Sequence, residues 1–304
     1  MLFRSSLAFL LHQLAVGAEK PVIAARFQKQ EQEKVRCLLC PHHCLLADGA
    51  LGRCLARRNH QGTLMAESYG QLTSLALDPI EKKPLYHFHP GSRILSAGSY
   101  GCNLSCAFCQ NHTISRQRAG SRFVPPEELA ALSQSVGHQN IGVAFTYNEP
   151  LIAPEYLLDC AALLRRQHQK VVLVTNGFIC PDPLEEVLPV VDALNIDLKC
   201  FSREGYRKLG GELETVLHTI RRSVEAGCHV EVTCLIVPGL SDSADEMERM
   251  VAWLAGVNPS IPFHVSRFFP RYKMSDALPT PVETVYALAD VARGYLRHVY
   301  TGNC

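Results

Sequence analysis

The sequence predicts an α/β protein built around a parallel sheet, and three observations support this prediction. Short β-rich runs alternate with helical patterns through the middle and C-terminal parts, which is typical of βα units. Polar and glycine residues follow the predicted strands. Apolar residues make up 47% of the 304 residues and charged residues 19%, so the chain can bury a large core.

The predicted elements follow one another regularly from residue 94 onward. Pro125-Pro126, followed by Glu127-Glu128, marks a helix start, and Gly227 marks a helix end. Strands are expected at residues 94–97, 141–147, 171–175, 193–198, 230–237, 263–268 and 298–301. Helices are expected at residues 125–135, 154–167, 183–190, 213–226, 243–255 and 281–295.

This pattern favours a partial barrel over a doubly wound sheet. In a parallel barrel the carboxyl ends of the strands form one face, where the chemistry gathers. The chain contains neither Gly-x-Gly-x-x-Gly nor Gly-x-x-x-x-Gly-Lys-Ser/Thr, so dinucleotide-binding and phosphate-loop folds lose their main support. A net charge of +1 gives no global basic surface for nucleic acid, and no apolar run reaches the roughly 18 residues of a membrane span.

The N-terminus carries an extension at residues 1–24. Residues 1–18 faintly resemble a signal peptide, although His12 and Gln13 interrupt the apolar stretch. The alternatives are a short amphipathic helix and a poorly ordered extension. We expect a cysteine-rich cap at residues 25–90, a barrel at residues 91–304 and a cytoplasmic protein.

The 13 cysteines indicate metal sites. Seven lie between residues 37 and 109 in two tight groups, and the other six are dispersed, as is typical of small buried apolar residues. Cysteines two or three residues apart are typical ligands, because several thiolates then converge on one ion or cluster. This usage favours a reducing compartment.

The first group lies in the predicted cap. It supplies four thiolates: Cys37, Cys40, Cys44 and Cys54. His42 and His43 could substitute for one of them. Four cysteines hold either a structural zinc ion or an auxiliary Fe–S cluster, and the spacing does not separate the two. Unligated thiols are the third interpretation.

The second group, Cys102-x3-Cys106-x2-Cys109, directly follows the first predicted strand. Three thiolates on one loop can hold three corners of a [4Fe–4S] cube, which normally takes four. The fourth iron then stays open for a substrate, as a catalytic metal keeps an open position. The alternative is a structural zinc ion with a distant fourth ligand.

This loop, with Phe108 before the third cysteine, resembles the cluster loop of the radical S-adenosylmethionine (SAM) superfamily. The resemblance implies a partial (β/α)6 TIM-like barrel and a [4Fe–4S] cluster whose open iron holds the amino and carboxylate groups of SAM. It implies oxidoreductase-type chemistry, in which the cluster reductively cleaves SAM to a 5′-deoxyadenosyl radical that abstracts hydrogen from a substrate. Cys102, Cys106 and Cys109 would be the catalytic cysteines.

Three further strand ends match the superfamily. Residues 146–150 stand where a Gly-Gly-Glu turn is expected, with Tyr147-Asn148 in place of the glycines. Residues 174–177 are similar to the Thr-Asn-Gly of the glycyl-radical activating enzymes, and residues 195–199 to their Asp-Leu-Lys. The resemblance assigns SAM binding to four side chains: Glu149, Asn176, Asp197 and Lys199.

Motifs along most of the chain resemble the AmmeMemoRadiSam system radical SAM protein, a distant relative of pyruvate formate-lyase activating enzyme. These motifs are residues 35–54, 78–88, 146–150, 264–268 and 272–274. The resemblance covers residues 25–304, although members often continue into a tail with a further cysteine pair. It implies AMMECR-type and Memo-like partner proteins and an electron donor such as flavodoxin or ferredoxin.

The sequence thus predicts a radical SAM enzyme that acts on a protein glycine or a small molecule. The alternative is a non-enzymatic zinc or Fe–S module that recruits partners, which would leave the four predicted SAM-binding residues without a shared purpose. A zinc hydrolase is disfavoured because the chain has no His-Glu-x-x-His. Residues 79–89 are expected to lie over the barrel mouth, and His264 and Arg267 to face the cavity.

Overall fold

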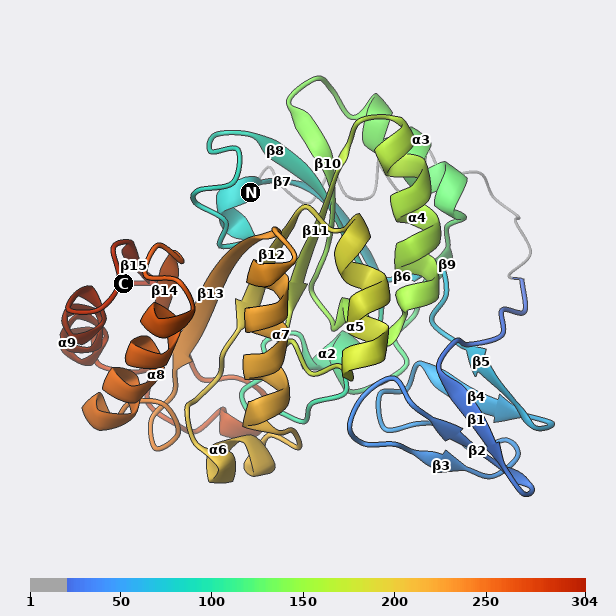
Figure 1. Cartoon of the computed structure of the whole chain (residues 1–304), viewed down its shortest axis with the longest axis horizontal. Coiled ribbons are helices and arrows are strands. Elements are labelled where there is room, and N and C mark those ends of the chain that lie inside the picture. Colours follow the sequence, from blue (N-terminus) through green and yellow to red (C-terminus); the bar gives the residue numbers. More distant parts are fainter. Residues whose placement is uncertain (1–20) are drawn as a thin grey trace.

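An eight-stranded sheet forms the centre of the computed structural model, which describes residues 21–304 (Figure 1). The signal-like residues 1–18, and most of the predicted extension, lie outside the described residues. The strands of the sheet are β7 (Ser74–Pro79), β8 (Arg93–Gly98), β10 (Asn140–Phe145), β11 (Lys170–Thr175), β12 (Ala193–Asp197), β13 (His229–Ile236), β14 (Phe263–Arg267) and β15 (Val299–Gly302). The predicted strands are confirmed to within one or two residues at each end.

The order of strands in the sheet is β15-β14-β13-β12-β11-β10-β8-β7. Neighbouring strands are parallel from β8 to β15, whereas β7 runs antiparallel to β8. β7 and β15 are the two edges, so the sheet is a partial barrel, as predicted. β7 comes from the range expected for the cap, so the sheet begins earlier in the chain than residue 91.

Helices follow the parallel strands and cover the outer face of the sheet (Figure 1). The longer ones are α3 (Pro126–Ser135), α4 (Pro154–Arg166), α5 (Pro181–Val187), α7 (Leu213–Glu225), α8 (Ala244–Val257) and α9 (Val282–Arg293), and the shorter ones are α2 (His112–Ser115) and α6 (Arg203–Lys208). Four one-turn 3₁₀ helices complete them: η1 (Ile80–Lys82), η2 (Pro150–Ile152), η3 (Leu188–Val190) and η4 (Tyr272–Met274). Within residues 21–304, no helix is long and apolar enough to cross a membrane.

Local sequence explains why these helices form where they do. α4 begins with Pro154 at its first turn, where a missing N–H does no harm. Its buried residues recur at helical spacing, so that one apolar face packs on the sheet: Leu157, Cys160, Ala161 and Leu164. α8 begins after Ser243, whose hydroxyl accepts a hydrogen bond from the amide of Glu246.

The cysteine-rich cap consists of small antiparallel sheets at one side of the barrel (Figure 1). They are formed by β1 (Gln28–Glu31), β2 (Lys34–Cys37) and β3 (Leu45–Leu46), and by β4 (Arg57–His60) and β5 (Thr63–Ala66). A further short pair joins β6 (Gln71–Leu72) to β9 (Arg122–Phe123). The Arg57 guanidinium links the cap to the barrel, because it lies 2.7 Å from the Glu155 carboxylate of α4 and both side chains are buried.

The segment between β7 and β8 lies at the amino ends of the parallel strands, because β7 pairs Pro79 with Arg93 at the start of β8. The expectation that residues 79–89 lie over the barrel mouth is therefore wrong. The segment turns into the barrel from the opposite end. Two of its side chains are fully buried against inward-facing residues of the sheet, and this small core contains Ile80, Leu85, Ile94, Ala144, Val172 and Ala193. We call residues 80–91 the plug.

Candidate active site

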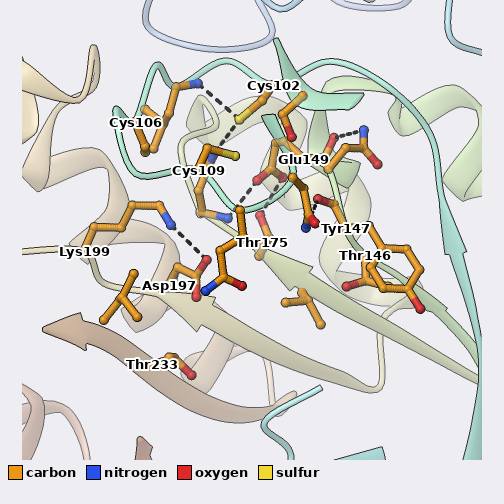
Figure 2. Close-up of a pocket in the computed structure, with 18 of the residues that line it drawn as sticks. Cys102, Cys106, Cys109, Thr146, Tyr147, Glu149, Thr175, Asp197, Lys199 and Thr233 are labelled. Atoms are coloured by element: carbon orange, nitrogen blue, oxygen red, sulfur yellow. Dashed lines mark hydrogen bonds and ion pairs between the residues drawn. The ribbon is translucent and has the colours of Figure 1, made fainter. Parts of the chain in front are cut away.

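A cavity of about 360 Å³ lies at the carboxyl ends of the parallel strands (Figure 2). The loop after β8 and the ends of β10, β11 and β12 contribute most of its wall. It brings together every residue predicted to hold the cluster or SAM: Cys102, Cys106, Cys109, Glu149, Asn176, Asp197 and Lys199. Figure 2 labels all of these side chains except Asn176 and shows the labelled ones around one shared space. The full set comes from four separate parts of the chain.

The cysteine loop passes tightly beneath the cap. Gly101 has φ +88°, and a Cβ at this position would lie 2.2 Å from the carbonyl oxygen of Cys54. Only glycine fits both the backbone conformation and the space. The Gly101 amide donates to the carbonyl of Ile114 at 2.8 Å, and the Leu104 amide donates to Sγ of Cys102 at 3.4 Å. The loop is therefore fixed by its own turn and by the cap above it.

Burial favours the protonated form of two cysteines of this loop. Burial raises the pKa values of Cys102 and Cys106, since a thiolate loses its hydration there. A metal that binds these sulfurs must displace their protons, and the charge of the ion offsets the desolvation of each thiolate. Within residues 21–304, these are the three cysteines that line the cavity.

Glu149 ends the turn after β10, and its carboxylate joins two strand ends. Its Oε1 accepts hydrogen bonds from the Thr175 hydroxyl at 2.6 Å and the Leu151 amide at 2.9 Å. Its Oε2 accepts from the Asn176 amide at 2.7 Å. Burial raises the pKa of Glu149 to about 7, against the effect of these hydrogen bonds. The residue is thus a nearly buried carboxylate on the cavity wall.

Asp197 and Lys199 form an ion pair on the neighbouring strand end, with Nζ and Oδ2 2.9 Å apart. Burial disfavours the ammonium form, yet the adjacent Asp197 carboxylate outweighs this and raises the pKa of Lys199. The Lys199 ammonium therefore stays charged in the cavity. Beside this pair, the side-chain nitrogen Nδ2 of Asn176 donates to Oδ1 of Asn103 at 3.0 Å and lies 3.5 Å from Sγ of Cys102.

The turn in which Tyr147-Asn148 replaces the expected glycines is held by the side chain of Asn148. Its Oδ1 accepts from the Ser99 amide at 2.9 Å, and its amide group donates to the carbonyls of Tyr100 and Gly101 at 3.2 Å. Tyr147 has φ +72°, a left-handed conformation that costs a bulky residue about 1–3 kcal/mol. From the sequence alone, Tyr147 and Asn148 could be described only as departures from the Gly-Gly-Glu turn.

The four cap cysteines line a second cavity of about 10 Å³, together with His42 and His43. The His42 ring contacts the cysteine loop directly, since its Nε2 lies 2.7 Å from the carbonyl oxygen of Asn103. Among residues 21–304, no three His, Cys, Asp or Glu side chains converge closely enough to hold a single ion. The three cysteines of the barrel loop are likewise too far apart to hold one ion together. This spacing suits a [4Fe–4S] cube, in which each thiolate binds a different iron.

The remaining residues predicted to face the cavity lie in different places. His264 is buried inside the barrel with its Nε2 2.7 Å from Oε2 of Glu231, and it does not line the cavity as expected. Arg267 does not line the cavity as expected, because strand residues alternate in direction and its Nε donates to the carbonyl of Thr280 at 2.7 Å. Lys82 and Lys83 of the plug do line the cavity, so residues 79–89 reach the site although they do not lie over the barrel mouth as expected.

The donor set fits a [4Fe–4S] cluster and SAM. Three thiols on one loop match the three protein ligands of a cube that leaves one iron open. A carboxylate, an ammonium and an amide on the same cavity wall match the ammonium and carboxylate of the methionine part of SAM.

Comparisons with known proteins agree with this geometry. Residues 97–254 match the radical SAM superfamily. The chain is 39% identical to an uncharacterized protein of Methanocaldococcus jannaschii, over 91% of this chain and 84% of that protein. It is 27% identical to the pyruvate formate-lyase-activating enzyme of Clostridium pasteurianum, over 49% of this chain and 64% of that enzyme.

The fold also resembles a solved structure over almost its whole length. A radical SAM methyltransferase from Sphaerobacter thermophilus superposes with a TM-score of 0.57 at 13% identity, covering 99% of this chain and 82% of that one. This likeness concerns the fold alone. From the family match, the long alignment with the archaeal relative and the cavity that the cysteine loop lines, we conclude that the chain belongs to the radical SAM superfamily and is an enzyme that uses a [4Fe–4S] cluster and SAM.

Proposed function

We propose that Cys102, Cys106 and Cys109 hold the [4Fe–4S] cluster and that four residues of the same cavity hold SAM: Glu149, Asn176, Asp197 and Lys199. The observation that carries this proposal is that one cavity gathers all seven side chains from four strand ends. When bound, the cluster and SAM supply a one-electron cleavage that yields a 5′-deoxyadenosyl radical, which abstracts hydrogen from the substrate.

The side chains that line the cavity bind and orient the cofactors. Lys199 offers a fixed ammonium to the carboxylate of SAM, and Asp197 keeps that ammonium charged and in place. Glu149 offers a carboxylate to the amino group, held rigidly by the amides of Leu151 and Asn176. Because hydrogen bonds already order these side chains, they lose little conformational entropy when SAM binds.

Two classes of substrate fit this enzyme, a protein glycine and a small molecule. Similarity to pyruvate formate-lyase-activating enzyme over about half of the chain supports the first. The motifs shared with the AmmeMemoRadiSam system support the second, a small molecule handled with AMMECR-type and Memo-like partners. We place the reaction in the cytoplasm, with flavodoxin or ferredoxin as the class of electron donor.

The cap cysteines are a second candidate metal site, for zinc or an auxiliary Fe–S cluster. Their shared cavity and the contact of His42 with the cysteine loop support a site that braces the barrel. Metal analysis of protein reconstituted with iron and sulfide separates the two. Iron beyond the four atoms of one cluster, lost when the four cap cysteines become alanine, indicates a cluster, whereas retained zinc indicates a structural ion.

An anaerobic assay tests the main proposal. Reconstituted and reduced protein is given SAM, and 5′-deoxyadenosine is measured beside a variant with Cys102, Cys106 and Cys109 replaced by alanine. We expect product from the native chain, none from the triple variant, and full product from a Cys304→Ala control, whose thiol is exposed and does not line the cavity. Loss of product in the control alone, or equal product in the triple variant, would contradict the assignment.

A further inference from the structure

The plug carries two lysines into the active-site cavity from the amino end of the barrel. Lys82 and Lys83 both line the cavity, whereas the cofactor residues line it from the carboxyl ends of the strands. Further polar side chains that line the cavity come from β13, β14 and the C-terminal segment, and they are Thr233, Ser266 and Asn303. This part of the cavity has no role in the cofactor site described above.

The two ammonium groups share a single carboxylate. Lys83 is 3% exposed, and its Nζ lies 2.8 Å from Oδ2 of Asp78, while Lys82 Nζ lies 3.3 Å from Oδ1. Asp78 also accepts hydrogen bonds from the Tyr147 hydroxyl at 2.8 Å and the Ser96 hydroxyl at 3.0 Å. With four donors on its two oxygens, Asp78 neutralises one lysine and leaves one positive charge over.

Lys83 keeps unused donor capacity. Its ammonium has three N–H groups, of which one points to Asp78, and it lies 4.7 Å from the centre of the Tyr147 ring. Bulk water does not reach a side chain that is 3% exposed. An anionic group that enters this end of the cavity would therefore meet a desolvated ammonium with a free donor, where electrostatic attraction is strong.

SAM already has ionic partners on the cofactor side of the cavity. Its ammonium is assigned to Glu149 and its carboxylate to Lys199, so neither group needs the lysines of the plug. The reacting substrate is the other molecule that shares the cavity, and it is the one that can place an anionic group against Lys82 and Lys83.

Buried contacts on both sides of Lys82 and Lys83 fix the plug in the barrel. On one side Ile80 and Leu85 are fully buried in the small core described above. On the other side the fully buried Glu231 carboxylate accepts the amide of His87 at 2.7 Å and the rings of His264 and His229 at 2.7 and 2.9 Å. A binding surface fixed in this way needs little reorganisation when a ligand arrives.

We propose that Lys82 and Lys83 form an anion-binding floor, and that the substrate places a carboxylate or phosphate group on it. The inference rests on the proposed function, because it assigns the rest of the cavity to the cluster and SAM. It names the chemical class of the substrate: a molecule with an anionic group at the end opposite the reacting carbon.

Binding of small anions tests the floor directly. Protein loaded with cluster and SAM, and kept oxidised so that no turnover occurs, is titrated with inorganic phosphate and with acetate at constant ionic strength. We expect saturable binding of at least one of them, and binding at least about tenfold weaker in a Lys82→Gln/Lys83→Gln variant. Phosphate alone indicates a phosphate-bearing substrate, and acetate alone a carboxylate. Equal binding in the variant, or no saturable binding of either anion, would overturn the proposal.

Two companion variants keep the test decisive. Replacing the buried Lys83 removes a partner of Asp78 and could disturb the fold. The Lys82 side chain is 64% exposed, so the single Lys82→Gln variant avoids this effect and must weaken anion binding by itself. The Lys170→Gln control removes a lysine paired with Asp192 outside the cavity and must bind anions like the native chain. Native protein that binds anions but not SAM would contradict the proposed function and leave the floor intact.

Discussion

Lys199 faces the cavity with its ammonium 2.9 Å from the Asp197 carboxylate. Replacing it by glutamine is expected to weaken SAM binding about tenfold to a hundredfold, because a hydrogen bond between charged groups contributes about 1.5–3 kcal/mol. Titration of cluster-loaded protein with SAM measures the change. Lys208→Gln is the matched control, since Lys208 pairs with Glu204 on the exposed surface of α6. Equal affinity in the Lys199 and Lys208 variants would remove Lys199 from the SAM site.

Glu231 is a second buried charge, but it serves the plug rather than the cofactors. Burial opposes its ionisation, yet hydrogen bonds from His229, His264 and the amides of His87 and Tyr86 lower the pKa of Glu231 to about 2. Its ordinary pKa is 4.5. A carboxyl with a depressed pKa stabilises the folded state at any pH above its unfolded value, and this contribution is lost as the pH falls from 4.5 through 2.

This shift predicts a specific acid sensitivity. Between pH 5 and pH 2 the native chain should lose on the order of 2–3 kcal/mol of unfolding free energy through Glu231. A Glu231→Gln variant should be less stable at pH 7 and lose less on acidification. Urea unfolding at several pH values, followed by the fluorescence of Trp253, measures both slopes. Parallel slopes for the two proteins would show that Glu231 does not carry this acid response.

At the scale of elements, the cysteine loop depends on its contact with the cap. Because Gly101 has a positive φ and no room for a Cβ beside Cys54, Gly101→Ala should push the loop away from the cap. We expect a large loss of iron per chain after reconstitution and weaker SAM binding. Gly120→Ala is the control, since an added Cβ meets nothing within 4 Å there. Full iron content in the Gly101 variant would show that the loop does not need this contact.

The parallel strands and their helices could be predicted from the sequence because local signals define each of them. Apolar runs end at turn residues, and proline or serine stands at helix starts such as Pro154 and Ser243. The site residues could be found for the same reason. Glu149, Asn176 and Asp197 each come at the end of a strand, and parallel strands bring their ends to one face.

The plug could not be predicted in this way. Its position follows from the antiparallel pairing of β7 with β8, which no local pattern specifies. The residues that make it unusual find partners far along the chain: Lys83 contacts the ring of Tyr147, and the amide of His87 donates to Glu231. The sequence places residues 79–89 over the barrel mouth, and only the tertiary structure shows that Lys82 and Lys83 reach the cavity from the amino ends of the strands.

For the whole molecule, the cap and the barrel are joined by a buried ion pair. Arg57 also donates to the carbonyls of Arg26 and Ile152, so its guanidinium connects the cap strands to the start of α4. Removing one partner of a buried pair leaves the other charge without compensation in a dry environment. The cap should therefore contribute to the stability of the barrel and to the shape of the cysteine loop beneath it.

Neighbouring arginines provide a matched test of this link. Arg57→Ala should lower the unfolding free energy by about 3–5 kcal/mol, because it leaves Glu155 buried and unpaired. Arg58→Ala should lower it by about 0–1 kcal/mol, since its pair with Glu67 is partly exposed. Urea denaturation of the two variants gives the comparison. Similar losses in both would mean that the Arg57 pair does not hold the cap to the barrel.

Electron paramagnetic resonance of the reduced cluster tests the central claim most directly. If Cys102, Cys106 and Cys109 leave one iron open for SAM, adding SAM to reduced native protein should change the cluster spectrum. The change should vanish in the triple variant of the barrel loop. A native cluster spectrum that SAM leaves unchanged, or a SAM response that survives in the triple variant, would contradict the account.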